Sequence, residues 1–269
     1  MNVALAQLRI ESAEIGANLD RAVEAVSEAA ADGADLVALP ELFTVGYFAF
    51  DSYARTAEPL CGPTLSRLRE TAVAEDVALL AGTVVEDLAA TAEETDAPTP
   101  AAEGLANTAV LFDADGDRRL VYRKRHLFGY DSAESDLLTP GERLPTATID
   151  GVTVGVSTCY DLRFPELYRE LVDRGVELVV VPSAWPYPRV EHWKLLPRAR
   201  AVENLAYVAA VNGVAEFEDD ALVGRSTVYD PWGTAIAATG EEPDIVTATV
   251  DTGRVGSRRE EFPALADRR

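Results

Sequence analysis

The fold of this 269-residue chain is predicted most clearly by residues 151–166, which read Gly151-Val-Thr-Val-Gly-Val-Ser-Thr-Cys159-Tyr-Asp-Leu-Arg-Phe-Pro-Glu166. The mostly apolar residues 152–157 predict a buried strand. Residues 164–174 predict a helix, because Pro165 suits the first turn of a helix. A strand followed at once by a helix is typical of α/β folds. Cys159 therefore stands at the carboxyl end of a strand, where such folds place their binding sites.

The rest of the chain alternates apolar strands with amphipathic helices. Strands are expected at residues 3–8, 35–39, 77–85, 107–112, 119–122, 177–181, 207–212, 226–229, 234–237 and 245–250, and helices at residues 18–31, 63–75 and 191–204, the last with a break or kink at Pro197. Residues 86–104 are rich in Ala, Thr, Glu and Pro and predict an exposed acidic loop. No linker divides the sequence, so we expect a single α/β domain over residues 1–269.

The charge balance excludes several classes of function. The chain has 46 acidic and 24 basic residues, a formal charge of −22. Hydrophobic residues make up 48% of it, too many for a disordered acidic chain. Because phosphates repel so acidic a protein, we expect neither nucleic acid nor an anionic membrane surface as a partner.

Lysine is almost absent from the basic residues. Only Lys124 and Lys194 are lysines, and the other basic residues are arginines. An acidic surface nearly free of lysine suggests adaptation to molar salt, where screening over a few ångströms removes the self-repulsion. We therefore expect a halophilic source, and a lysine that has been retained becomes a candidate for a specific role.

The cellular setting expected from the sequence is the cytoplasm. Cys61 and Cys159 do not make a disulfide framework in a chain of this length, and Cys61 is expected to be a small apolar filler. No apolar run reaches the ~18 residues of a membrane span. The first ten residues lack the features of a signal peptide.

Four side chains could carry chemistry, and each also has a plain structural interpretation. The Cys159 thiol lies near a helix start that can stabilise a thiolate, although a lone cysteine is more often a buried structural residue. Glu41 has apolar neighbours that would raise its pKa toward the range of a general base; otherwise it is a solvated loop acid. Lys124 could neutralise an oxyanion or belong to a basic turn. Glu134 alone would be interpreted as a surface acid.

The segments around these residues carry a resemblance. Glu41 lies in Leu39-Pro-Glu-Leu-Phe43, Lys124 in Tyr122-Arg-Lys-Arg-His-Leu-Phe128, and Glu134 precedes Leu-x-Pro-Gly141. Together with the Cys159 segment, they resemble the nitrilase superfamily, the carbon–nitrogen hydrolases. Further matches are Pro182-Ser-Ala-Trp-Pro186, His192-Trp193, Arg198-Ala-Arg-Ala-Val-Glu-Asn204 and Asp230-Pro-Trp-Gly233.

This resemblance implies a fold and a mechanism. The fold would be the four-layer α-β-β-α sandwich, an α/β architecture commonly assembled as homodimers or larger homo-oligomers. Cys159 would be the nucleophile and Glu41 the general base. Lys124 and the backbone N–H of Tyr160 would hold the oxyanion, and Glu134 would keep Lys124 and Glu41 in place. No metal or organic cofactor is required.

Within the superfamily, the Cys159 segment and residues 183–189 look most like the Nit and ω-amidase branch, which hydrolyses small amides bearing a distal carboxylate. Arg163 is the candidate to bind that carboxylate through its planar fork, unless it forms a structural ion pair. Tyr47 and Trp185 are expected to line the pocket. Nitrilases, N-carbamoyl hydrolases and aliphatic amidases would share the same Glu, Lys and Cys. A binding protein that kept the fold and lost activity is the alternative from another class.

Overall fold

The structure, a computed structural model, describes residues 1–130, 132–217 and 220–268. One of its two large sheets is built mainly from the first half of the chain, from β1 (Asn2–Gln7), β2 (Leu36–Ala38), β3 (Ala78–Asp87), β4 (Leu105–Phe112), β5 (Arg118–Arg123) and β14 (Asp244–Thr249). The strand order is β14-β1-β2-β3-β4-β5. β1, β2 and β3 are parallel, whereas β14, β4 and β5 pair antiparallel with their neighbours.

The second large sheet comes from the second half of the chain. It contains β6 (Thr146–Ile149), β7 (Val152–Val156), β8 (Leu178–Ser183), β9 (Tyr207–Asn212), β12 (Thr227–Tyr229) and β13 (Ala235–Ala238). The order is β13-β12-β9-β8-β7-β6, with β7, β8 and β9 parallel at its centre. A small hairpin of β10 (Val214–Glu216) and β11 (Ala221–Val223) stands apart from both sheets.

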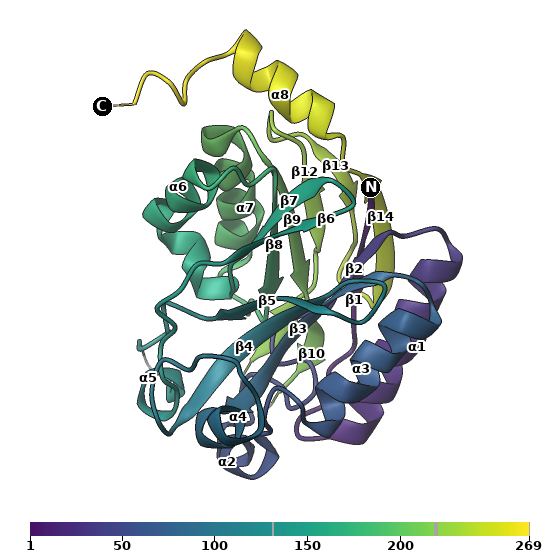
Figure 1. Ribbon diagram of the computed structural model, residues 1–269, viewed down its shortest axis with the longest axis vertical. Helices are drawn as coiled ribbons and strands as arrows, with labels where there is room; N and C mark the ends of the chain where they lie inside the picture. The colour runs from purple at the N-terminus through teal and green to yellow at the C-terminus, as the bar shows by residue number, and fades with distance from the viewer. Residues whose placement is uncertain (131, 218–219, 269) are drawn as a thin grey trace.

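Helices cover the outer faces of the two sheets (Figure 1). α1 (Ile15–Ala31) and α3 (Pro63–Ala74) pack on the first sheet, and α6 (Pro165–Asp173) and α7 (Val190–Asn204) cover the second. The remaining elements are η1 (Phe50–Ser52), α2 (Tyr53–Thr56), α4 (Leu88–Glu94), α5 (Glu134–Leu137), η2 (Cys159–Arg163) and α8 (Thr252–Glu261). This arrangement is the expected α-β-β-α sandwich. Every helix in the described ranges is too short or too polar to cross a lipid bilayer.

The two faces of β1 show why the layers stack in this order. Val3 and Leu5 belong to the apolar core shared with the second sheet, whereas Ala4 and Ala6 belong to the core under α1 and α3. Successive side chains of a strand point to opposite faces, so the run of apolar residues from Val3 to Ala6 needs a layer on each side.

Residues 86–104, which were expected to form an exposed acidic loop, include the end of a strand and a helix. β3 continues through Glu86, α4 follows at Leu88, and only the residues after α4 lack regular structure before β4. Glu86 is buried on β3, and Arg123 on β5 compensates its charge by donating to it twice, from Nε and Nη2, at 2.7 Å each. The prediction of an exposed loop is therefore wrong for its first half, which continues a strand and then forms a helix.

The expectation for Cys61 is also wrong, and α7 does not have the break that was one of the two outcomes expected at Pro197. Cys61 is exposed and its thiol donates to Glu94 at 3.3 Å, so it is not an apolar filler. Pro197 lies inside α7, which runs unbroken from Val190 to Asn204. Burial of Trp193 and Ala201 on either side of the proline anchors both halves of this helix to the sheet.

Candidate active site

Cys159 stands on the turn that links β7 to α6. The strand ends at Val156, and the short helix η2 begins at Cys159 itself. Its backbone has φ = 44°, a left-handed conformation that is strained for a residue with a side chain. The Asp161 carboxylate holds the turn by accepting a hydrogen bond from the N–H of Thr158 at 2.9 Å. The placement predicted from the sequence, after a strand and before a helix, is confirmed.

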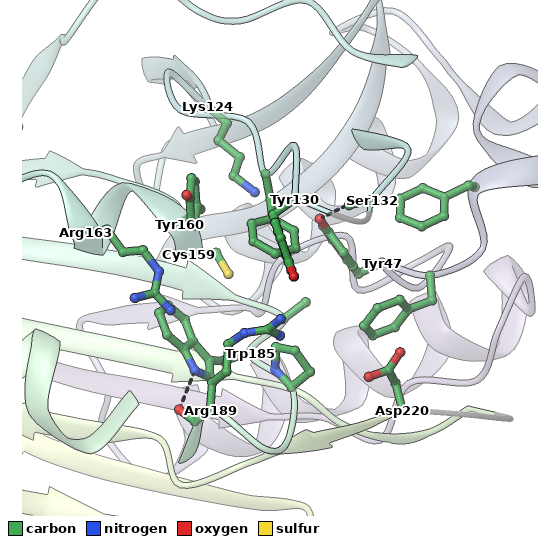
Figure 2. Close-up of a pocket in the computed structure, with 15 residues that line it drawn as sticks. Tyr47, Lys124, Tyr130, Ser132, Cys159, Tyr160, Arg163, Trp185, Arg189 and Asp220 are labelled. Carbon is green, nitrogen blue, oxygen red and sulfur yellow. Dashed lines mark hydrogen bonds between the residues drawn. The ribbon is translucent and has the colours of Figure 1, made fainter. Parts of the chain in front are cut away.

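A cavity of about 240 Å³ opens at Cys159 (Figure 2). Its lining includes Tyr47, Phe128, Tyr130, Tyr160, Trp185, Lys124, Arg163 and Arg189, and also the carboxylate of Asp220. The structure thus brings Tyr47, Tyr160, Arg163 and Trp185, all predicted from the sequence, to one cavity. Pockets for drug-sized ligands hold about 300–1,000 Å³, so this cavity suits a small molecule.

Two guanidinium groups stand on aromatic faces of this cavity. Arg163 lies over Trp185, with Cζ 5.2 Å from the ring centroid, and its Nη2 is 3.1 Å from Nδ1 of His192. Arg189 lies over Phe128 at 5.4 Å. Within the described residues neither arginine forms a salt bridge with a carboxylate, although most arginines of this acidic chain do. The structural ion pair considered for Arg163 is therefore not formed in this part of the chain.

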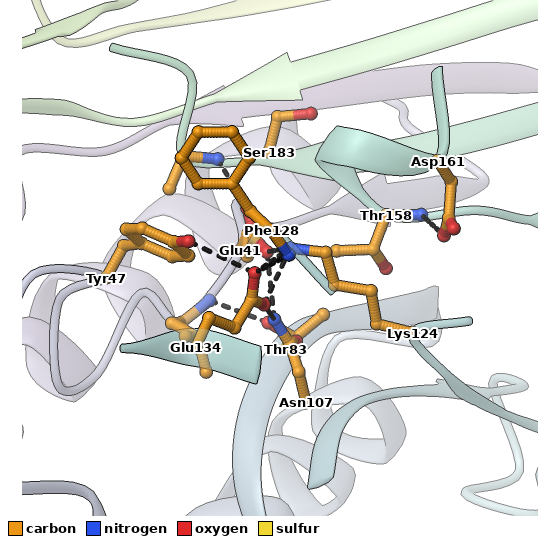
Figure 3. Close-up of polar contacts among 12 residues, drawn as sticks. Glu41, Tyr47, Thr83, Asn107, Lys124, Phe128, Glu134, Thr158, Asp161 and Ser183 are labelled. Atoms are coloured by element: carbon orange, nitrogen blue, oxygen red, sulfur yellow. Dashed lines mark hydrogen bonds and ion pairs between the residues drawn. The ribbon is translucent and has the colours of Figure 1, made fainter. Parts of the chain in front are cut away.

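The polar cluster beneath the cavity joins Glu41, Lys124 and Glu134 (Figure 3). Glu41 follows β2, Lys124 follows β5, and Glu134 opens α5. The Nζ of Lys124 donates to Oε1 of Glu41 at 2.9 Å and to the two oxygens of Glu134 at 2.7 and 3.0 Å. All three side chains are at most 1% exposed. Lys124 also reaches the cavity wall, whereas the two glutamates lie behind it.

Other groups also donate hydrogen bonds to the two glutamates. The backbone N–H of Ala184 donates to Oε2 of Glu41 at 2.8 Å, and that of Phe128 donates to Oε2 of Glu134 at 2.8 Å. The hydroxyl of Tyr47 donates to Glu134 at 3.1 Å. Asn107, which the sequence analysis missed, donates from Nδ2 to Glu41 at 2.8 Å and to Glu134 at 3.3 Å.

Burial and charge set the protonation of this cluster. Burial raises the pKa of Glu41, Lys124 lowers it, and Glu134 raises it again, and the net direction is upward. Burial alone would lower the pKa of Lys124, but Glu134 and Glu41 together raise it well above its usual value. Burial and the charge of Glu41 raise the pKa of the Cys159 thiol well above its usual value, although Lys124 lowers it. The resting site therefore holds an ammonium and a protonated thiol beside a carboxylate of raised pKa.

A buried aspartate connects the Cys159 turn to the segment that follows Lys124. Asp161 accepts hydrogen bonds from the backbone N–H of His126 at 3.0 Å and from the Tyr122 hydroxyl at 2.5 Å, and its Oδ1 is 2.7 Å from Nδ1 of His126. The strand that presents the amine and the turn that presents the thiol are thereby fixed to each other.

Comparison with known proteins identifies the family. The family model described as carbon-nitrogen hydrolase matches residues 2–260. The chain belongs to the carbon–nitrogen hydrolase family. Its family and its amidase relatives together show that it is an amidase, and the resemblance to the nitrilase superfamily and its Nit branch is confirmed.

Two curated relatives of this carbon–nitrogen hydrolase are amidases by name. It is 35% identical to the 2-oxoglutaramate amidase of Paenarthrobacter nicotinovorans, a match that covers 100% of the chain and 90% of the relative. It is 34% identical to omega-amidase NIT2 of Mus musculus, over 99% of the chain and 94% of the relative.

Solved structures share the fold along nearly the whole chain. Nit3 of Saccharomyces cerevisiae, described as a member of branch 10 of the nitrilase superfamily, superposes with a TM-score of 0.86 at 31% identity over 98% of this chain and 94% of Nit3. A mutant amidase from Nesterenkonia sp. AN1 superposes with a TM-score of 0.82 at 28% identity over 98% of each chain, and carries acrylamide added to its active-site cysteine.

Proposed function

We propose that this amidase is an ω-amidase-like enzyme, which releases ammonia from small amides with a distal carboxylate through a thioester on Cys159. One observation supports this most. The cavity at Cys159 has a buried ammonium beside it and two guanidinium groups on its wall, without a carboxylate salt bridge to either guanidinium in the described ranges. The curated relatives named 2-oxoglutaramate amidase and omega-amidase agree with a substrate of this class.

The first half of the reaction forms the thioester. Glu41 takes the proton of the Cys159 thiol as substrate binds, and the thiolate sulfur attacks the amide carbonyl carbon. Negative charge then develops on the carbonyl oxygen, where Nζ of Lys124 and the backbone N–H of Tyr160 stabilise it; each such donor contributes about 10²–10³ in rate. Glu41 returns the proton to the amide nitrogen, the C–N bond breaks, and ammonia leaves.

The second half hydrolyses the thioester. Glu41 removes a proton from a water molecule, the hydroxide oxygen attacks the thioester carbon, and the C–S bond breaks. The sulfur leaves as a thiolate and recovers the proton from Glu41. Glu134 holds Lys124 in place: its carboxylate accepts hydrogen bonds from the resting ammonium at 2.7 and 3.0 Å, and it keeps the shorter one when the ammonium turns an N–H toward the oxyanion.

The distal carboxylate of the substrate binds at the arginine side of the cavity. Arg163 offers a planar pair of donors, and Trp185 supports its guanidinium from one face. Arg189, which the sequence analysis missed, adds a second positive charge on the same cavity. A nitrile or an uncharged amide would leave both cations unused, so nitrilases and aliphatic amidases fit this cavity less well than enzymes whose substrates carry a carboxylate.

The medium and the assembly belong to the same proposal. We extend the proposal to a cytoplasmic setting in a halophile, and the charge of −22 and the scarcity of lysine support activity in molar salt. Exposed apolar side chains on and near α7, among them Leu195, Val202, Trp232 and Phe262, support a homodimer or larger homo-oligomer of this single-domain chain.

Ammonia release from a panel of amides in molar KCl tests the proposal. The panel contains 2-oxoglutaramate, succinamate, glutamine, butyramide, a nitrile and an N-carbamoyl amino acid, with the Cys159→Ala variant as the blank. We expect release from the ω-monoamides that the variant lacks. Release from another class alone would keep the thioester and reject the ω-amidase assignment.

A further inference from the structure

Asn107 is the first polar residue of β4, and it contacts both buried carboxylates of the site and the backbone of Lys124. Its backbone carbonyl accepts a hydrogen bond from the N–H of Lys124 at 2.9 Å. Its Nδ2 donates to Oε1 of Glu41 at 2.8 Å and to Oε1 of Glu134 at 3.3 Å. In the part of the chain that the structure describes, Asn107 and Lys124 are the side chains that donate to both carboxylates.

The cluster needs such a donor because its charges do not balance. Two carboxylates, Glu41 and Glu134, share the one ammonium of Lys124, and all are buried. Like-charged carboxylates at short range push each other toward the protonated form. A neutral amide that donates to both compensates them without adding a second cation.

The carbonyl oxygen of the Asn107 side chain supports a specific orientation of this amide. Oδ1 of Asn107 is buried and has no hydrogen-bond partner among the described residues. An unpaired buried acceptor costs about 1–3 kcal/mol. Turning the amide over would set that carbonyl oxygen against two carboxylates, which is worse. The fold therefore accepts an unpaired oxygen in order to aim the two N–H groups at Glu41 and Glu134.

We propose that Asn107 is a positioning residue for catalysis, which keeps Glu41 ionised and aligned between Lys124 and Cys159. This inference rests on the proposed role of Glu41 as general base. Glu41 faces Lys124, Glu134, Cys159 and the Tyr47 hydroxyl, and burial together with Glu134 raises its pKa. Asn107 opposes that rise through its N–H donors.

Asn107 does not line the cavity, which separates its effect from substrate binding. We expect Asn107→Ala to lower kcat by about 10- to 100-fold, the usual effect of losing a hydrogen bond to a charged group, with KM within about twofold of the wild type. The acid limb of the plot of kcat against pH should move to higher pH, because Glu41 without this donor is protonated more easily. Asn107→Asp, which adds a third negative charge at the same place, should move it further.

Asn204 provides the matched control. It is buried to the same extent as Asn107 but hydrogen-bonds Arg200 and Arg169 on the outer side of the second sheet. Asn204→Ala and Asn204→Asp should lower the melting temperature without moving the acid limb. An unmoved acid limb in folded Asn107 variants, or a rise in KM as large as the fall in kcat, would overturn the proposal. So would failure of Asn107→Ala, Asn107→Ser and Asn107→Asp to fold where the Asn204 variants fold.

A second readout needs no substrate. In a Cys61→Ser background, the rate at which iodoacetamide alkylates Cys159 reports the proton held between the thiol and Glu41. We expect the pH profile of alkylation to shift in the Asn107 variants and not in the Asn204 variants. If the alkylation profile shifts in the Asn107 variants but the wild type hydrolyses no amide of the panel, this inference stands and the proposed function is rejected. If the wild type hydrolyses the ω-monoamides but the alkylation profile does not shift, the proposed function stands and this inference is rejected.

Discussion

Replacing Arg163 by glutamine changes one charge in the cavity and little else, because glutamine keeps a polar, extended side chain. Succinamate and butyramide form a matched pair of substrates: they have the same chain length, and a methyl group of one replaces the carboxylate of the other. The proposal predicts a selective loss on succinamate.

The size of this loss follows from the contact. A hydrogen bond to a charged group is worth about 1.5–3 kcal/mol, which corresponds to roughly 10- to 150-fold in kcat/KM. Arg163 is partly buried and supported by Trp185, so its charge is not fully screened by solvent. At 1 M salt the Debye length is about 3 Å, so direct contact survives while longer-range attraction is lost. We therefore expect about 10- to 100-fold loss on succinamate and at most a few-fold loss on butyramide.

The assay is initial-rate ammonia release at one fixed KCl concentration. Arg198→Gln is the control, because this exposed arginine of α7 lies outside the cavity lining. Arg189→Gln should shift the ratio of kcat/KM for the two substrates in the same direction as Arg163→Gln. Equal losses on succinamate and butyramide would refute the assignment of the arginine side of the cavity to a carboxylate.

Three further outcomes are expected. Cys159→Ala should abolish ammonia release while the circular dichroism spectrum and melting temperature remain those of the wild type; residual turnover would exclude a thioester on this residue. Because Glu41 must be ionised to act and burial raises its pKa above the ordinary 4.5, kcat/KM should fall as pH drops through that raised value, and an acid limb at or below 4.5 would contradict this. Arg123→Met leaves the buried carboxylate of Glu86 without its partner and should destabilise the protein by about 3–5 kcal/mol in heat or urea unfolding, a loss that molar KCl does not repair; unchanged stability would show that the pair contributes nothing.

The sequence carried the outline of the fold because its strands are short, apolar and separated by clear turns. The positions of Cys159 after β7 and of Glu41 after β2 followed from local pattern. Glu134 did not: alone it reads as a surface acid, and only its place in a family motif marked it, whereas the structure buries it completely.

What the sequence could not show are contacts between distant segments. Asn107 is 66 residues from Glu41, and nothing in its own neighbourhood distinguishes it from other strand residues. Arg189 lies in the loop between β8 and α7, and it lines the cavity only because of the path that this loop takes in space. Glu86 appeared to open an acidic loop because its partner, Arg123, is 37 residues away on another strand.

The two lysines show how a compositional signal gains meaning from structure. Lys194 is exposed and pairs with Glu191, a contact that an arginine could make equally well. Lys124 is buried, with its ammonium between two carboxylates and at the wall of the cavity. A compact ammonium can donate in three directions, to Glu41, to Glu134 and to an oxygen in the cavity, whereas the planar guanidinium of arginine directs its donors within one plane. The scarcity of lysine in this acidic chain therefore does not mark a catalytic residue by itself; burial between opposite charges at a cavity separates the lysine that arginine could not replace from the one that it could.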